Sequence, residues 1–170
     1  RVYIIETIRR KGLEALAMAS LTRKLSVITS NDIKPILKIA FATDNNRMVN
    51  QHFGSAKTFA IYGVNSEASS LLTIAEFCDI DVLDMEDKLV HKLELLDDCV
   101  AVYCRACGAS AVKQLLERNI QPLKVPEDIA IKQLLKAFRQ ELNERPSYWL
   151  AKAILRQRSA DRIGSWNLEY

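Results

Sequence analysis

The sequence predicts an α/β protein with a mixed sheet of about five strands, the first three antiparallel and the last two parallel, flanked by helices. Short apolar runs rich in β-branched residues recur between 36 and 125. Only the turn-like segment 65–70 separates the second run from the third, whereas helical periodicity separates the later runs. Strands joined by a short turn pair antiparallel, and strands joined through a helix run parallel in one sheet.

The strands are expected at 36–43 (ILKIAFAT), 59–64 (FAIYGV), 71–77 (LLTIAEF), 99–104 (CVAVYC) and 120–125 (IQPLKV). Pro35 and the polar residues 44–46 bound the first of them, as expected for a short buried strand. Helices are expected at 88–96, 109–117, 130–142 and 146–158. In the first helix Leu89, Leu93 and Leu96 share one face, which predicts packing against the sheet.

Three segments of the chain differ in composition. Residues 1–34 form an N-terminal extension, predicted to be helical because apolar residues from Val2 to Leu16 recur at spacings of three and four. Residues 35–145 form the α/β domain, which is expected to bind a cofactor. Residues 146–170 form a C-terminal helical tail.

Composition and charge exclude several classes of protein. Hydrophobic residues make up 49% of the chain and charged residues 26%, which argues against global disorder. The longest stretch without Asp, Glu, Lys or Arg is 58–66, far short of a membrane span, so we expect a cytoplasmic protein. Basic residues gather in 1–24 and 132–162 around an acidic middle. This distribution argues against a nucleic-acid-binding protein. The basic segments are then either solvated helix faces or a docking surface for an acidic partner.

The sequence shows no catalytic apparatus. It has two histidines, His52 and His91, no Gly-x-Ser-x-Gly motif and no phosphate-binding glycine loop. His91 is expected on an exposed helix face. Of the four cysteines, Cys78 and Cys99 fall in apolar runs and are expected to be reduced core residues. We therefore expect a protein that is not an enzyme.

One candidate binding loop is 50–55, Asn-Gln-His-Phe-Gly-Ser, which follows the first strand. In open α/β sheets, ligands bind at the carboxyl ends of strands. A neutral imidazole at His52 would be a good ligand for iron and other transition metals. The alternative is a turn histidine hydrogen-bonded to the backbone.

The second candidate is the Cys104-Arg-Ala-Cys107 motif, which ends the fourth strand and precedes a helix at Gly108. A helix N-terminus lowers a thiol pKa and offers free amides to an anion, and Arg105 adds positive charge. A structural zinc site usually has four protein ligands and no open position, and this motif supplies only two ligands. The alternative is a set of small residues that pack a tight strand–helix turn.

The two loops together would present one imidazole and two thiols beside free amides. That donor set suits an anionic iron–sulfur cluster better than a hard cation. The predicted metal ligands are therefore His52, Cys104 and Cys107. The remaining residues expected to contact the cofactor are Asn50, Phe53, Gly54, Ser55, Arg105 and Gly108.

Several motifs resemble the nitrogenase iron–molybdenum cofactor biosynthesis family. They are KIAFAT at 38–43, VNQHFGS at 49–55, FAIYGV at 59–64, DCVAVYC at 98–104, GASAVKQL at 108–115 and QPLKV at 121–125. They follow one another in order across about 36–143, and the tail PSYWLAKAI at 146–154 resembles one branch of the family in particular.

This resemblance implies a ribonuclease-H-like fold and a role without catalysis. Members bind iron–sulfur precursors of the iron–molybdenum cofactor and pass them between the NifB product and the NifEN scaffold. The family's cluster-binding histidine corresponds to His52. The alternative is a docking chaperone or regulator of nitrogenase assembly that holds no metal, and a zinc or redox protein is a third possibility.

Overall fold

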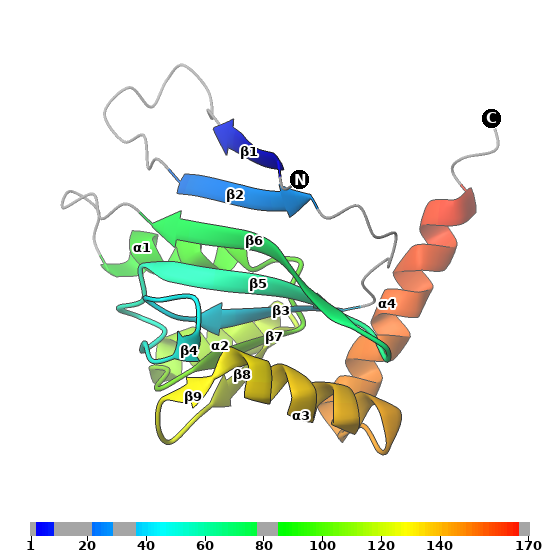
Figure 1. The fold of residues 1–170 in the computed structure, drawn as a ribbon. Coiled ribbons are helices and arrows are strands. Elements are labelled where there is room, and N and C mark those ends of the chain that lie inside the picture. Colours follow the sequence, from blue (N-terminus) through cyan, green and yellow to red (C-terminus); the bar gives the residue numbers. More distant parts are fainter. Residues whose placement is uncertain (1–2, 9–21, 29–36, 78–84, 167–170) are drawn as a thin grey trace.

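The computed structural model describes residues 3–8, 22–28, 37–77 and 85–166. A seven-stranded sheet with strand order β1-β2-β6-β5-β3-β7-β8 forms its centre (Figure 1). The strands of this sheet are β1 (Tyr3–Ile8), β2 (Thr22–Ile28), β3 (Leu37–Ala42), β5 (Thr58–Val64), β6 (Ser69–Phe77), β7 (Ala101–Cys104) and β8 (Gln121–Lys124).

The five strands from β6 to β8 confirm the predicted mixed sheet. β3 pairs antiparallel with β5, and β5 pairs antiparallel with β6 across the short 65–68 turn. On its other side β3 pairs parallel with β7, and β7 pairs parallel with β8. Taken in chain order, these five strands lie in the sequence 3-2-1-4-5 with the second antiparallel, which is the ribonuclease-H-like arrangement expected.

Four helices complete the described fold: α1 (Met85–Leu95), α2 (Ala109–Glu117), α3 (Ile131–Asn143) and α4 (Tyr148–Trp166). In Figure 1, α1 and α2 lie behind the sheet and α3 lies in front of it. Each predicted helix is present, and α4 continues beyond its predicted end. Within the described residues, none of these helices is both long and apolar enough for a bilayer crossing.

The sheet separates two hydrophobic cores because side chains alternate along β3. Leu37, Ile39 and Phe41 belong to one core, which contains buried residues of α3 and the start of α4. Ala40 and Ala42 belong to the other, which contains buried residues of α1 and α2. Since β3 is buried on both faces, its carboxyl end is a rigid base for the loop that follows.

The predicted helix near the N-terminus is wrong over Tyr3–Ile8, which forms β1 and pairs antiparallel with β2. Ile4, Ile5, Thr7 and Ile8 are β-branched, and such side chains favour strands over helices. The pairing of β2 with β6 then extends the sheet. Residues 9–21, Cys78 and 167–170 lie outside the described residues, and the division at 34/35 and 145/146 stays a prediction.

A second, two-stranded ladder lies beside the main sheet. β4 (Met48–Val49) pairs antiparallel with β9 (Ile129–Ala130), and the Ile131 amide donates to the Arg47 carbonyl at 2.9 Å. This ladder ties the chain that follows β3 to the start of α3. Both ends of the candidate loop at 50–57 are therefore anchored, by β4 and by β5.

Candidate functional site

The two predicted loops meet at the carboxyl ends of β3 and β7. The Arg105 amide donates to the Gln51 carbonyl at 2.9 Å, and the Phe53 amide donates to the Ala106 carbonyl at 2.8 Å. They lie side by side because β3 and β7 are parallel neighbours, whose carboxyl ends share one edge of the sheet. The prediction that the two loops share one rim is confirmed.

His52 lies between the two bonded residues of its loop, and its side chain is exposed to solvent. Its neighbour Phe53 is fully buried and packs on Phe59, with ring centroids 5.6 Å apart. A turn in which the Ala56 amide donates to the His52 carbonyl at 2.9 Å closes the loop. The backbone is thus fixed on both sides of a solvent-exposed imidazole.

The other predicted residues of this loop differ in environment. Asn50 is half-buried and holds the loop to the end of β3: its Nδ2 donates to Asp44 Oδ1 at 2.6 Å, and its Oδ1 accepts from the Asp44 amide at 3.2 Å. Gly54 and Ser55 are exposed, and a Cβ added at Gly54 would meet nothing within 4 Å. Of the predicted contact residues, Asn50 and Phe53 shape the loop, whereas His52, Gly54 and Ser55 face outward.

Lys92 of α1 supports this loop from beneath, and the sequence reasoning missed it. Its side chain is only 7% exposed. Its Nζ donates to the Phe53 carbonyl at 3.2 Å and also to the Gly54 carbonyl, and it lies 5.6 Å from the Phe77 ring centroid. Burial of an ammonium is costly unless strong acceptors replace water, and these two carbonyls offset part of that cost for Lys92.

Cys104 and Cys107 are free thiols that end β7 and precede α2. Cys104 is fully buried, and Cys107 is half-buried. Interaction with the Cys107 side chain, together with burial, raises the pKa of Cys104 well above its ordinary value. Interaction with Cys104, with help from Lys124, lowers the pKa of Cys107. Of the two thiols, Cys107 is therefore the one that loses its proton more readily, while Cys104 keeps its proton.

Lys124 is the second residue that the sequence reasoning missed. It ends β8 directly opposite Cys104 in the parallel register, and its charge favours thiolate formation in the pair. The cation predicted for this role, Arg105, is engaged elsewhere: its guanidinium pairs with Asp128 and donates to the Pro126 carbonyl at 3.1 Å. Arg105 thereby holds the 126–128 segment against the Cys-x-x-Cys loop.

The N-terminus of α2 lies beside the same thiols. Gly108 occupies the N-cap in extended conformation, and no side-chain hydrogen bond caps the helix. Gly108 is exposed, and a Cβ added there would meet nothing within 4 Å. The first amides of α2 are therefore available to an anion at the rim.

The three predicted metal ligands lie on one rim but at different depths. His52 is exposed, Cys107 is half-buried and Cys104 is sealed in the core. Among residues 37–77 and 85–160, no three His, Cys, Asp or Glu side chains converge in a way that could hold a metal ion. Ligation by His52, Cys104 and Cys107 together stays a prediction. A cargo that docks on the open rim would reach His52 and Cys107 first.

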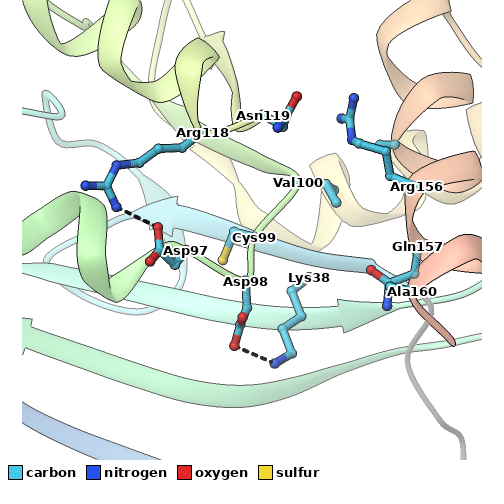
Figure 2. Close-up of a pocket in the computed structure, with 11 residues that line it drawn as sticks. Lys38, Asp97, Asp98, Cys99, Val100, Arg118, Asn119, Arg156, Gln157 and Ala160 are labelled. Carbon is cyan, nitrogen blue, oxygen red and sulfur yellow. Dashed lines mark hydrogen bonds and ion pairs between the residues drawn. The ribbon is translucent and has the colours of Figure 1, made fainter. Parts of the chain in front are cut away.

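A cavity of about 440 Å³ lies at the opposite ends of β3 and β7. Figure 2 shows two ion pairs there, Lys38 with Asp98 at 3.4 Å and Arg118 with Asp97 at 2.7 Å. Arg156 and Gln157 of α4 line the same cavity. None of the predicted site residues lines it, so the rim with His52 remains the candidate site.

Known proteins match this chain over the whole region that carries the rim. A family model described as "Dinitrogenase iron-molybdenum cofactor" matches residues 35–141. "Protein NifX" of Azotobacter vinelandii is 54% identical over 144 residues, which cover 85% of this chain and 91% of the relative. "Protein NifX" of Sinorhizobium fredii is 31% identical, covering 82% and 93% respectively. Part of "FeMo cofactor biosynthesis protein NifB" from Frankia alni is 29% identical, covering 66% of this chain and 23% of NifB.

Proposed function

The chain belongs to the dinitrogenase iron–molybdenum cofactor family, and we propose that, as an accessory protein of that cofactor's biosynthesis, it carries an iron–sulfur precursor from the NifB product to the NifEN scaffold. The observation that carries the proposal is the fixed loop around His52. Hydrogen bonds on either side of His52 hold its backbone to the Cys-x-x-Cys loop while the imidazole stays exposed. A ligand presented in this way can reach a cluster that is bulky and already assembled.

The surroundings of His52 suit an anionic cargo. Lys124 lies beside the thiols, Lys92 lies beneath the loop, and the uncapped α2 N-terminus adds partial positive charge. A charge pair at 4 Å is worth about 1 kcal/mol in water and about 4 kcal/mol at an effective dielectric of 20. Because the rim is open, electrostatics assists binding, and direct ligation by His52 supplies most of the affinity.

The small number of exposed donors fits transfer better than storage. His52 is exposed and Cys107 is half-buried, so the rim offers two accessible ligands at most among those predicted. A site with a complete ligand shell would hold its cluster and release it slowly, whereas one with one or two protein ligands lets the next protein compete. The proposed role is therefore carriage without catalysis.

Anaerobic cluster transfer tests the proposal. The purified protein is mixed with a NifB-bound iron–sulfur precursor, separated, and assayed for bound iron and visible absorbance. We expect His52→Ala to lower uptake at least about tenfold, which is the loss of about 1.4 kcal/mol of ligation. The control is His91→Ala, because His91 lies on α1 beside Glu94, at 3.7 Å, and outside the rim. Equal uptake by the two variants would remove His52 from the site.

A docking role without metal is the second candidate, and α4 favours it. Tyr148 is 77% exposed and Leu155 is 63% exposed, and the basic side chains of Lys152 and Arg156 are exposed on the same helix. Lys152→Glu together with Arg156→Glu should weaken capture of NifEN. If the protein is a carrier, the same double variant should still take up the cluster as the wild type does. Normal NifEN binding by a wild-type protein that takes up no iron would favour the docking role instead.

A further inference from the structure

The Cys-x-x-Cys motif has properties that cargo carriage does not require. Cys104 ends β7 and Cys107 directly precedes the N-cap of α2, so the two thiols share one short strand–helix turn, and each shifts the pKa of the other. Formation of a disulfide would bring the two sulfurs to ~2.05 Å and so draw the half-buried Cys107 toward the buried Cys104. In a reducing compartment, a pair of this kind is more often catalytic or redox-sensing than structural.

We propose that Cys104 and Cys107 are a redox-active dithiol, which a low-molecular-weight disulfide such as oxidised glutathione converts to an intramolecular disulfide, and that this oxidation loosens the loop that presents His52.

Exposure determines the order of the steps. Cys107 is half-buried whereas Cys104 is fully buried, so the sulfur of Cys107 attacks the small disulfide first. A bond forms between Cys107 Sγ and one glutathione sulfur, and the other glutathione leaves as a thiol. Cys104 Sγ then attacks Cys107 Sγ, and the second glutathione leaves as a thiol. The protein loses two electrons and two protons, and one small disulfide becomes two small thiols.

The residues between the cysteines couple this chemistry to the His52 loop. Arg105 donates its amide to the Gln51 carbonyl at 2.9 Å, and Ala106 accepts from the Phe53 amide at 2.8 Å. Closing the disulfide draws Cys107 toward Cys104, which is held in the core at the end of β7, so the peptide groups between the two cysteines must shift. Both hydrogen bonds beside His52 are made by these peptide groups.

Oxidation would act on the cargo in two ways, and this part of the inference rests on the proposed function. It would weaken the backbone support of His52, and it would remove Cys107 as a ligand because a disulfide sulfur is not a thiolate. The reduced protein would then accept a cluster and the oxidised protein would release it. The redox chemistry itself requires no cargo, so it can be tested on the protein alone.

The experiment treats the reduced protein with oxidised glutathione under argon. Peptide mapping and mass spectrometry should find a Cys104–Cys107 disulfide that dithiothreitol reverses. Hydrogen exchange at the Phe53 and Arg105 amides should become at least about tenfold faster in the oxidised protein. Cys107→Ser should abolish the disulfide. Cys99→Ser should not, because Cys99 is buried two residues before the start of β7, at the opposite end of that strand from Cys104.

Each outcome decides part of the proposal. A stable glutathione adduct on Cys107 without an internal disulfide, or no reaction of Cys107 at all, would overturn the dithiol. An internal disulfide with unchanged exchange at both amides would overturn the coupling to His52. Failure of the reduced wild-type protein to take up an iron–sulfur precursor would count against carriage alone, and the mapped disulfide would still stand.

Discussion

Lys92 gives the sharpest test of how the candidate loop is held. Lys92→Met keeps the length and apolar stem of the side chain but removes the ammonium that donates to the Phe53 and Gly54 carbonyls. Those carbonyls would then face an apolar side chain beneath the loop. The substitution therefore removes the support of the loop without changing its sequence.

The magnitude follows from the number of bonds. Hydrogen bonds that involve a charged group contribute about 1.5–3 kcal/mol each, so two of them would contribute about 3–6 kcal/mol. Removing the buried ammonium also relieves its desolvation penalty, which offsets part of that loss. We expect the free energy of unfolding to fall by about 2–4 kcal/mol.

Urea denaturation of the apo protein measures this change, and hydrogen exchange over 51–57 shows whether it is local. The matched control is Lys113→Met on α2, because the Lys113 side chain is 78% exposed and its contact with Glu117 is 4.0 Å long. An exposed pair of that kind should contribute within about 0.5 kcal/mol. If Lys92→Met and Lys113→Met lower stability equally, the carbonyl contacts of Lys92 do not support the loop.

Two further predictions use the α2 N-cap and Tyr103, a half-buried residue of β7. Gly108→Ser and Gly108→Asp should each raise stability by about 0.5–1 kcal/mol, since a side-chain cap is missing and space is open. Only the aspartate should weaken uptake of an anionic cluster, and equal uptake by the two variants would place the cargo away from α2. Burial, with a smaller contribution from Glu141, raises the pKa of Tyr103 to about 12. The unfolded chain releases this proton near pH 10 and the folded chain does not. Stability should therefore fall by about 2–3 kcal/mol between pH 10 and 12. In Tyr103→Phe this part of the pH dependence should disappear, as followed by denaturation at each pH, and an unchanged profile would contradict the assignment.

The fold was predictable where local pattern and tertiary structure agree. The runs that became β3, β5, β6, β7 and β8 are apolar and bounded by turns or helices, so their periodicity indicated both type and order. The strand in the N-terminal segment was not predictable in this way, because Ile5, Ile8 and Leu16 also fit a helical spacing. What makes Tyr3–Ile8 a strand is its pairing with β2, a long-range partner that local periodicity does not reveal.

The location of the candidate site was predictable from the sequence, but the two lysines that contact or adjoin its loops were not. His52 and Cys107 follow strands that proved to be parallel neighbours, so strand order alone brought their loops together. Lys92 was missed because a lysine beside a leucine stripe usually extends into water. Lys124 was missed because its position opposite Cys104 depends on the register of two strands, which the sequence does not specify.

The way the loop is held also has a consequence for how metal preference can change. Main-chain atoms of Gln51 and Phe53 hold the backbone on either side of residue 52, so the position of that residue rests on bonds that its own side chain does not make. The donor atom can therefore be exchanged for sulfur or oxygen while the surrounding scaffold keeps its shape. If the proposed carriage is right, a change in a single codon would alter the donor that the loop offers to its inorganic passenger.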